Sequence, residues 1–280
     1  MKGAAFMALR ENDIQQAVIN IKVLGVGGGG NNVLRRLSKE KFLDVELIAI
    51  NSDMKQLGLT EKDGVKVVPI GVSMTKGYGT GGNVEIGEQA AIAEEQEIKK
   101  MLIGADMVFI TCGMGGGTGT GAAPVIAEIS QNLGALTVAI VTKPFTFEGK
   151  RRMENAMSGL EELKKHVDTL IVIPNDRLRE IIDKSTPLIE AFKEVDNVLR
   201  RGVQSISDLI AVVGLVNLDF ADVKAVMEKS GNAIIGIGIG MGEDRAIEAA
   251  KQAVSSPLLE TSITGATDAI INITGGVNLT

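Results

Sequence analysis

The sequence predicts an α/β fold: a parallel sheet covered by helices on both faces, a long central helix, and a smaller α+β domain after it. Short β-type runs alternate with helix-like segments from residue 21 to residue 173, and such alternation is typical of parallel sheets. Three glycine clusters, at residues 25–30, 77–82 and 113–121, each follow a predicted strand. An apolar stripe at helical spacing then runs from residue 187 to residue 213.

The predicted strands are short runs rich in Val and Ile, at residues 21–26, 46–51, 65–70, 106–111, 136–141 and 169–173. Between them we expect helices at residues 31–39, 85–102, 122–133 and 150–165. In sheets of this kind, ligands bind at the carboxyl ends of the strands. The three glycine clusters lie there, which indicates one site assembled from several loops.

An unusually long helix is predicted over residues 187–213. Thr186 can cap it, Pro187 suits its first turn, and Glu190 favours the positive end of the helix dipole. At about 1.5 Å per residue it would span roughly 40 Å, the length of a whole domain. Clean heptads with charged flanks are absent, which argues against a coiled coil. After this helix we expect a polar loop at 217–222, helices at 223–229 and 243–255, and strands at 233–239 and 268–273.

Composition limits the class of protein. The 280 residues are 45% hydrophobic, which suits a large core in two domains or lobes. The net charge is −6 and no basic stripe is present, which argues against nucleic acid as the main partner. No apolar stretch reaches ~18 residues, so no direct membrane insertion is expected. Residues 1–20 contain internal charges without a signal-peptide pattern and are interpreted as an N-terminal arm.

Cysteine and histidine each occur only once, and this excludes further classes of protein. Cys112 alone cannot form a disulfide framework and fits a reducing cytoplasm. Because no Cys/His/Asp arrangement accompanies it, we interpret it as a small buried residue. Because His166 is the only histidine, a His-rich zinc site is excluded. It lies in a charged stretch that we expect to be exposed to solvent. No metal site made by protein side chains is predicted.

Residues 115–121 read GGGTGTG, between a predicted strand and a predicted helix. Because glycine has no side chain, a ligand can approach its backbone closely. A loop of this kind before a helix directs several N–H groups at one point, where the helix dipole also favours an anion. A flexible linker would lack the strand before it and the helix after it. The segment therefore predicts a phosphate-binding loop.

A nicotinamide-dependent dehydrogenase is an alternative. Residues 23–32 (VLGVGGGGNN) follow a strand and open a helix, and the turn at 51–53 lies where such enzymes read the ribose. Against it, a dinucleotide needs one glycine-rich turn for its pyrophosphate, whereas this chain has three. No GxxxxGK[ST] motif is present, so phosphate binding would depend on backbone N–H groups, threonine hydroxyls and a bound Mg²⁺.

The combination of motifs resembles the FtsZ family of tubulin-like bacterial cell-division GTPases, in which GGGTGTG is the tubulin-type signature. Further matching segments cover nearly the whole chain: IKVLGVGGGGNN (21–32), NSD (51–53), CGMGGGTGTGAAP (112–124), VTKPFTFEGKRR (141–152), IPNDRL (173–178), FKEVDN (192–197), GVQSISDLI (202–210) and GLVNLDFADV (214–223). The resemblance implies a Rossmann-like GTP-binding domain at 21–186, the central helix at 187–213, and an activation loop with a partial C-terminal domain at 214–280.

The resemblance also implies which residues contact the nucleotide. It assigns the phosphate and nucleoside side of the pocket to Gly28, Gly29, Gly30, Asn31 and Asn32, and the phosphates to the loop of Gly115, Gly116, Gly117, Thr118 and Gly119. It assigns ribose and nucleotide contacts to Thr142, Pro144, Glu148 and Arg152, stacking to Phe192 and guanine reading to Asp196. A carboxylate suits guanine because it accepts from both N1–H and N2–H. Glu148 and Arg152 alone could form only a helix salt bridge.

Hydrolysis needs groups that this pocket does not supply. In the family they come from the next subunit: Asn217, Asp219 and Asp222 match the loop that enters the neighbour's site and polarises the attacking water. Read locally, Asp219 could be only an N-cap of the following helix, and Asp222 a partner of its dipole. The resemblance favours catalysis in trans.

The chain departs from the family's pattern at several positions. Cys112 and Val195 each replace an alanine, which we expect to be tolerated, and two larger departures follow. Thr80, Gly82 and Val84 stand where Ala, Ala and Pro are usual, and we expect the extra flexibility to weaken sensing of the γ-phosphate. The family's second domain continues through further strands, a linker and a peptide that recruits membrane adaptors. Because the chain stops at Thr280, we expect a truncated or unusually short form without that peptide.

The leading prediction is a cytoplasmic GTPase of the mid-cell division ring that binds GTP or GDP with Mg²⁺ and polymerises head-to-tail with copies of itself. Division-ring adaptor proteins are expected as partners of a full-length form only. A second hypothesis keeps nucleotide binding but, because of the shortened second domain, no competent polymerisation. The dehydrogenase is the third, and it lacks a catalytic His or Lys/Tyr arrangement.

Overall fold

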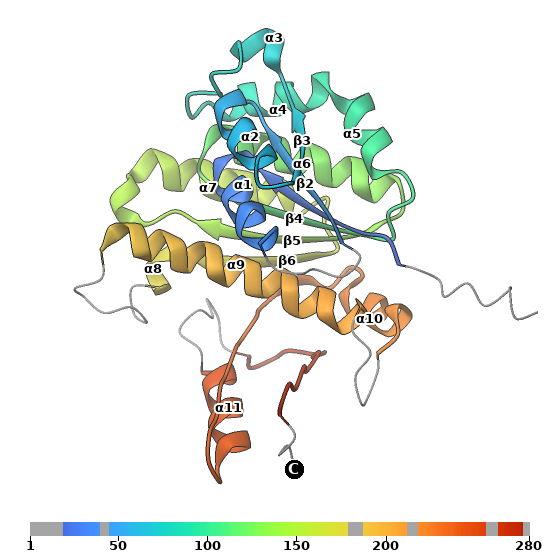
Figure 1. Cartoon of the computed structure of the whole chain (residues 1–280), viewed down its shortest axis with the longest axis vertical. Helices are drawn as coiled ribbons and strands as arrows, with labels where there is room; N and C mark the ends of the chain where they lie inside the picture. Colours follow the sequence, from blue (N-terminus) through green and yellow to red (C-terminus); the bar gives the residue numbers. More distant parts are fainter. Residues whose placement is uncertain (1–18, 40–44, 179–186, 212–217, 256–262, 277–280) are drawn as a thin grey trace, which may run out of the picture.

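The computed structural model of the chain describes residues 19–39, 45–178, 187–211, 218–255 and 263–276. Within these ranges, seven parallel strands form one sheet in the order β3-β2-β1-β4-β5-β6-β7 (Figure 1). The strands are β1 (Ile21–Val26), β2 (Val45–Asn51), β3 (Lys66–Pro69), β4 (Met107–Gly113), β5 (Leu136–Lys143), β6 (Thr169–Pro174) and β7 (Gly231–Ala233). The predicted parallel sheet is confirmed, and its order reverses between β1 and β4.

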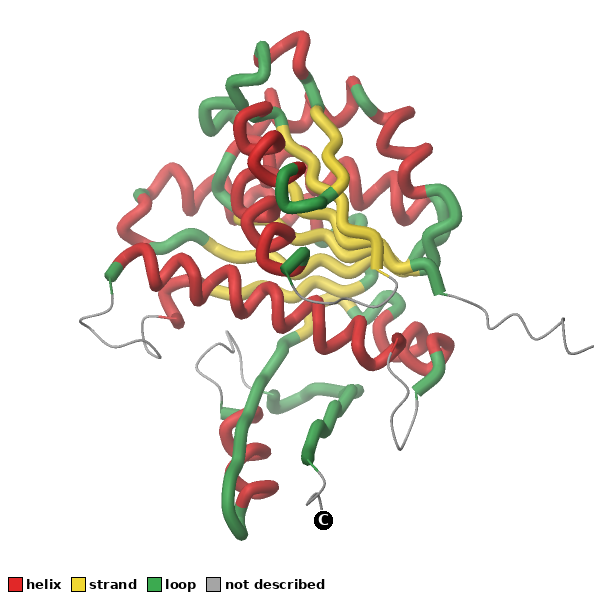
Figure 2. The backbone as a smooth tube through the Cα atoms, in the orientation of Figure 1, coloured by secondary structure: helices red, strands yellow, loops and turns green. Residues whose placement is uncertain are grey.

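Helices cover both faces of this sheet (Figure 2). One face is covered by α1 (Gly27–Leu37), α2 (Met54–Glu61), α9 (Leu188–Ala211) and α10 (Phe220–Met227), and the other by α4 (Val84–Ala93), α5 (Glu95–Leu102), α6 (Gly117–Asn132) and α7 (Lys150–Leu163). Short helices α3 (Val72–Thr75) and α8 (Asn175–Leu178) lie in loops, and α11 (Arg245–Val254) lies beyond the sheet.

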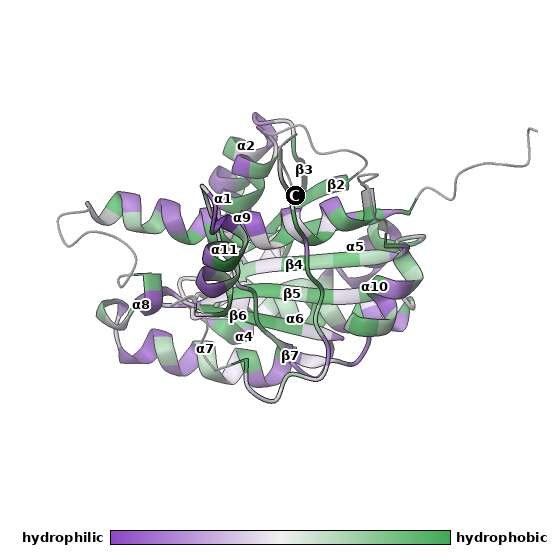
Figure 3. Ribbon diagram, turned by 90° about the horizontal axis from the view of Figure 1, so that it is seen from below, coloured by the Kyte–Doolittle hydropathy of each residue, from purple (hydrophilic) through white to green (hydrophobic). Residues whose placement is uncertain are grey.

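Each central strand contributes to two hydrophobic cores. Leu24 and Val26 of β1 belong to the core under α4–α7, whereas Ile21 and Val23 of the same strand belong to the core under α1 and α9. Both faces are buried, so the strands read as continuous apolar runs. Figure 3 shows how these strands differ from a helix at the surface of the domain: the central strands are mainly hydrophobic, while α9 alternates between hydrophobic and hydrophilic residues.

Several helices differ from their predicted bounds. The helices predicted at 31–39 and 122–133 begin earlier, at Gly27 and Gly117, so the glycine turns themselves form the first turns of α1 and α6. The helix predicted at 85–102 is divided at Glu94, whose backbone (φ −106°, ψ 17°) leaves the helical region. Helix α9 has 24 residues, and Thr186 and residues 212–213 of its predicted extent lie outside the described residues.

The strands predicted at 233–239 and 268–273 are wrong. Only Gly231–Ala233 form a strand, paired with β6, and residues 234–240 and 267–276 follow an irregular path. The segment 234–240 lies against α11 instead, because its small residues allow a close approach: a Cβ atom on Gly238 would be 1.8 Å from the carbonyl oxygen of Ala249. Within the described residues, neither segment has the partner strand that a hydrogen-bond ladder requires.

Candidate functional site

A cavity of about 380 Å³ opens at the carboxyl edge of the sheet, where the strand order reverses between β1 and β4. Its walls come from the ends of β1, β4 and β5, the first turns of α1 and α6, and the first half of α9. Doubly wound sheets bind their ligands at this position. The cavity is therefore the candidate binding site.

Most of the predicted nucleotide contacts line this cavity: Gly28, Gly29, Asn32, Gly116, Gly117, Thr118, Gly119, Thr142, Pro144, Glu148, Arg152, Phe192 and Asp196. The fold thus gathers residues that are far apart in the sequence around one space. Gly30, Asn31 and Gly115 do not line it. The contacts with a nucleotide remain predictions for the whole set.

Gly30 and Asn31 join α1 to the sheet. A Cβ atom on Gly30 would be 2.3 Å from the carbonyl oxygen of Thr111, so the helix can lie against β4 only with glycine there. The buried Asn31 amide donates to the Gly25 carbonyl (2.8 Å) and accepts from the Asn51 amide (2.7 Å). These two residues hold the glycine turn in place behind the cavity.

Gly115 has a comparable structural part on the other side of the cavity. Its N–H donates to the Thr120 hydroxyl (2.8 Å), and its φ of 97° lies in the left-handed region that favours glycine. A Cβ atom there would be 2.5 Å from the carbonyl oxygen of Arg152. Gly115 therefore folds the loop against α7, and the residues after it face the cavity.

The first turns of α1 and α6 are suited to an anion. In the described structure neither helix has a side-chain N-cap, whereas α2 is capped by Asp53 and α4 by Asn83. The two turns also meet backbone to backbone, since a Cβ atom on Gly27 would be 2.9 Å from the Gly119 nitrogen. First-turn N–H groups without a side-chain acceptor, at the positive end of a helix, form a phosphate-binding arrangement.

Aromatic and charged side chains of α9 also line the cavity. Phe192 is 38% exposed and packs edge-to-face on Phe145, with ring centroids 5.3 Å apart. Asp196 accepts from Nε of Arg36 at 3.1 Å. Burial raises the pKa of Asp196 to about 6, and the charge and hydrogen bond of Arg36 oppose this rise. An exposed aromatic face beside a half-buried carboxylate can stack on a planar base and accept its N–H groups.

Glu148 and Arg152 do form the ion pair expected of their spacing, at 2.6 Å, and both line the cavity. Glu148 also accepts from the N–H of Phe145 (2.9 Å), so it fixes the turn before α7. Glu148 and Arg152 can therefore form a helix salt bridge and still be in a position to contact a ligand.

Asn175 is a cavity residue for which the sequence predicted no role. It is buried at the start of α8, and among the described residues its Oδ1 has no hydrogen-bond partner. A buried amide oxygen without a partner, in a residue that lines a cavity, is suited to accept a hydrogen bond from a ligand. The available signal was its place in the segment IPNDRL. Val26, Gly27, Thr80, Gly113, Met114, Val195 and Leu199 complete the lining.

The turn at 51–53 does not form part of this cavity. The Asp53 carboxylate accepts from the N–H groups of Lys55 (2.9 Å) and Gln56 (3.1 Å) as the N-cap of α2. The ribose-reading carboxylate that the dehydrogenase alternative needs is thus engaged in capping a helix outside the cavity.

The acidic residues of α10 lie away from the cavity. Asp219 and Asp222 are exposed, and the Asp219 carboxylate accepts from the Asp222 N–H (2.8 Å) as the helix N-cap. The end of α10 is attached to the amino edge of the sheet, where the Thr169 hydroxyl donates to the Met227 carbonyl (2.6 Å). Figure 1 shows α10 beside the C-terminal end of α9. Asn217 lies outside the described residues.

Other candidate chemistry is limited in the part of the chain that the structure describes. No three His, Cys, Asp or Glu side chains there are arranged to hold a metal ion. Cys112 is fully buried, which raises its pKa to about 12, so it is an unreactive thiol at neutral pH. No described helix combines the length and apolar character needed to cross a membrane.

Known proteins match the chain over most of its length. Residues 20–183 match the Tubulin/FtsZ family, GTPase domain, and residues 231–280 match the FtsZ family, C-terminal domain. An empty FtsZ dimer from M. jannaschii is 52% identical, with a TM-score of 0.84 over 90% of this chain and 74% of that one. A mutant FtsZ from the same organism is 53% identical, with a TM-score of 0.84 over 89% and 74%. CetZ from Methanosaeta thermophila is 25% identical, with a TM-score of 0.68 over 84% and 68%.

Proposed function

Since the chain belongs to the tubulin/FtsZ family, we propose that it is a GTPase whose copies join head-to-tail into filaments, and that the acidic loop of one copy completes hydrolysis in the cavity of the next. The proposal includes the division of the chain into an arm (1–20), a GTP-binding domain (21–186), a central helix (187–213) and a C-terminal region (214–280). It also includes action in a division ring.

The separation of the cavity from the acidic residues is the observation that supports this proposal. The cavity opens at the carboxyl edge of the sheet, whereas α10 is bonded to the amino edge. Within one copy, Asp219 and Asp222 therefore cannot reach a nucleotide in the cavity. Two copies stacked with the amino edge of one on the carboxyl edge of the other bring the two parts together, and such a heterologous contact propagates.

The cavity's own groups bind and orient the nucleotide. The first turns of α1 and α6 would hold the phosphates, and Phe192 and Asp196 would stack on guanine and read it. Mg²⁺ bound with the nucleotide would neutralise phosphate charge. It fits this site because it is usually held by substrate phosphates and water, and the phosphate end offers hydroxyls such as that of Thr118. The reacting water is then left to the neighbour's carboxylates.

The variant Asp219→Asn tests the acidic loop. Asparagine caps a helix as well as aspartate does, so α10 keeps its N-cap and loses only the charge. GTP affinity should stay within about twofold, while turnover falls by about 10²-fold, the size of a general acid–base contribution. Phosphate release per molecule should rise with protein concentration in the unmodified chain. Turnover that is independent of concentration, or unchanged in the variant, contradicts the proposal.

Mixing two defective chains gives a sharper test. Asp219→Asn copies keep the cavity, and Asp196→Ala copies keep the acidic loop. In random 1:1 filaments about a quarter of the contacts combine an intact cavity with an intact loop, so hydrolysis should return to about that fraction. Light scattering on the unmodified chain, measured in parallel, reports assembly. No assembly with GTP and Mg²⁺ would favour the second hypothesis, a nucleotide-binding protein that does not polymerise.

A further inference from the structure

The turn at residues 51–53 contains a buried hydroxyl that the proposed function does not use. Ser52 is 0% exposed and is not among the residues that line the cavity. Its main chain is held by hydrogen bonds: its N–H donates to the Asn51 Oδ1 (2.9 Å), and its carbonyl accepts from the Gly79 N–H (3.2 Å). The fold therefore holds the backbone of Ser52 in one place.

The Ser52 hydroxyl meets a hydroxyl that belongs to the cavity wall. Ser52 Oγ and Thr118 Oγ1 are 2.7 Å apart, the usual distance for a hydrogen bond between two hydroxyls, and Thr118 lines the cavity. A hydroxyl has one proton and two lone pairs, so either oxygen can be the donor, but only one of the two protons can lie between them. The direction of this bond decides where the other proton points.

Burial sets the direction of the bond. Within the part of the chain that the structure describes, Ser52 Oγ has no hydrogen-bond partner besides Thr118 Oγ1. If Thr118 donated, the Ser52 proton would be buried without an acceptor, which is unfavourable. If Ser52 donates, both hydroxyls are satisfied, because Thr118 is in contact with the cavity and its own proton can reach water or a ligand. Ser52 is therefore the donor.

The Thr118 proton then needs an acceptor of its own. The other hydroxyl near it, Thr80 Oγ1, is 3.5 Å away, at the weak limit for a hydrogen bond. A phosphate oxygen in the cavity would be a better acceptor, because hydrogen bonds to ionised groups are shorter and about twice as strong as those between neutral groups. Thr118 lies in the first turn of α6, which has no side-chain N-cap among the described residues.

We propose that Ser52 is a positioning residue of the binding site: by donating to Thr118 Oγ1, it directs the Thr118 proton into the cavity, where it donates to a phosphate oxygen of the nucleotide. The inference rests on the proposed function, in that the cavity takes a nucleotide. A hydroxyl without such a partner is distributed over three staggered positions. Holding it in one of them before the ligand arrives should raise the affinity about threefold.

A double-mutant cycle with Ser52→Ala and Thr118→Val tests the inference. Valine keeps the shape of threonine without the hydroxyl. Affinity for a slowly hydrolysed GTP analogue with Mg²⁺ is measured by calorimetry, at protein concentrations below assembly. Thr118→Val should lower it about tenfold, the size of one hydrogen bond to a charged group, and Ser52→Ala about threefold. In the Thr118→Val chain, adding Ser52→Ala should lower it no further, because no proton is left to direct.

Ser130→Ala is the matched control. Ser130 is also 0% exposed, and its Oγ lies 2.8 Å from Thr137 Oγ1, but neither residue lines the cavity. The substitution should lower the free energy of unfolding about as much as Ser52→Ala does, measured by chemical denaturation, and leave the affinity for the analogue unchanged. Equal losses of affinity in Ser130→Ala and Ser52→Ala would overturn the inference, because they would report only a lost buried hydrogen bond.

The cycle separates the remaining outcomes. A loss in Ser52→Ala that is equally large with and without the Thr118 hydroxyl overturns the inference, because Ser52 would then only support its turn. An unchanged affinity in Ser52→Ala overturns it as well. If the unmodified chain does not bind the analogue, the proposed function itself fails. If it binds and the two substitutions are not coupled, only the inference fails.

Discussion

The two edges of the sheet use their polar groups in different ways. At the carboxyl edge, the first turns of α1 and α6 have no side-chain cap among the described residues, and Asn175 has a buried oxygen without a partner there. At the amino edge, charged side chains are paired with one another and with backbone groups of the same chain. The polar groups of the amino edge are therefore satisfied by the chain itself, whereas the carboxyl edge keeps polar groups that a ligand can satisfy.

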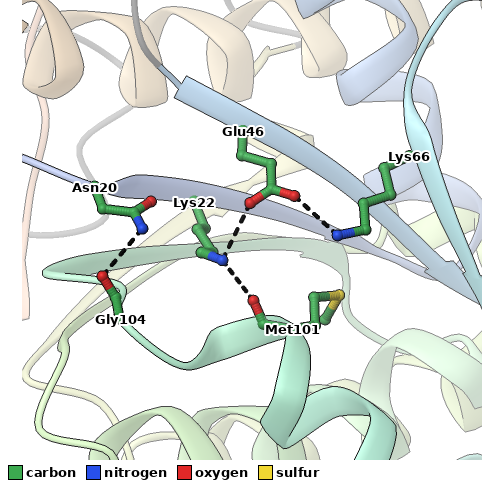
Figure 4. A network of polar contacts seen from close by, with 6 residues as sticks. All are labelled: Asn20, Lys22, Glu46, Lys66, Met101 and Gly104. Atoms are coloured by element: carbon green, nitrogen blue, oxygen red, sulfur yellow. Dashed lines mark hydrogen bonds and ion pairs between the residues drawn. The ribbon is translucent and has the colours of Figure 1, made fainter.

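A ladder of three charged residues crosses the amino edge (Figure 4). Glu46 lies 3.1 Å from Lys22 and 3.0 Å from Lys66, and Lys22 also donates to the Met101 carbonyl at 2.5 Å. Lys22 is only 7% exposed. Burial raises the pKa of Glu46, but the hydrogen bonds and charges of Lys66 and Lys22 together outweigh it and hold that pKa below its usual value.

Asp168 completes the same edge. Its two carboxylate oxygens accept from the N–H groups of Thr137 (2.9 Å) and Lys229 (3.3 Å). Lys229 has a φ of +54°, an uncommon conformation for a residue with a side chain, just after α10. Asp168 therefore connects the segment that follows α10 to the sheet through hydrogen bonds within the chain.

The largest expected effect is that of Gly121→Ala at the carboxyl edge. A Cβ atom there would be 2.1 Å from the Val84 carbonyl oxygen, so α4 and its preceding loop must move away from α6. The free energy of unfolding should fall by about 1–3 kcal/mol, as in other overpacked sites, and GTP affinity should fall with it. Chemical denaturation and nucleotide titration measure both.

Gly58→Ala is the matched control, because nothing lies within 4 Å of its added Cβ atom and it is also a helical glycine, in α2. It should raise the free energy of unfolding by about 0.5–1 kcal/mol and leave GTP affinity unchanged. Equal effects of the two substitutions would show that the close approach of α4 to Gly121 does not determine stability or GTP affinity.

Glu46→Gln should separate stability from binding at the other edge. It leaves the buried ammonium of Lys22 without its counter-charge, so the free energy of unfolding should fall by about 1–2 kcal/mol while GTP affinity stays within about twofold. Lys66→Gln is the control: Lys66 is 55% exposed, and its loss should cost less than about 0.5 kcal/mol. A loss of GTP affinity in Glu46→Gln would mean that the two edges are coupled.

The pH dependence of this stabilisation follows from the lowered pKa of Glu46. A carboxyl with a lower pKa in the folded than in the unfolded state stabilises the fold above the unfolded value, near 4.5, and loses this effect as the pH falls through the folded value. The difference in unfolding free energy between the unmodified chain and Glu46→Gln should therefore shrink on acidification below about pH 4.5. A difference that grows there contradicts the assignment.

The same comparison explains what the sequence could predict. The carboxyl edge was predictable because its groups lie in contiguous motifs: a strand, a glycine turn and a helix start within a few residues. The ladder was not, because Lys22 and Met101 are 79 residues apart and meet only through the fold. Asn175 was missed for a related reason, since its importance lies in the missing partner of its oxygen rather than in its type.

The wrong strand predictions have a physical cause as well. Within the strand predicted at 233–239, Ile and Gly alternate from residue 235 onward. This two-residue period is expected of a strand, but a segment that packs on a helix can show it too. The glycines at 236, 238 and 240 each approach a carbonyl of α11 too closely for any side chain. Periodicity reports which residues face a neighbour, and the identity of that neighbour depends on residues elsewhere in the chain.

The smallest effect is a pH dependence of binding that only the carboxyl edge should show. In the proposed function the ionised Asp196 carboxylate reads guanine. Burial raises the pKa of Asp196 to about 6, so GTP affinity should fall about fourfold from pH 7.5 to pH 5.5 as the ionised fraction falls. Asp196→Asn should bind weakly and without this dependence, while Glu46→Gln should retain it. Arg36→Gln removes the charge that opposes the raised pKa, so the fall should begin at a higher pH. An affinity that is flat between pH 5.5 and pH 7.5 in the unmodified chain would mean that this carboxylate does not read the base.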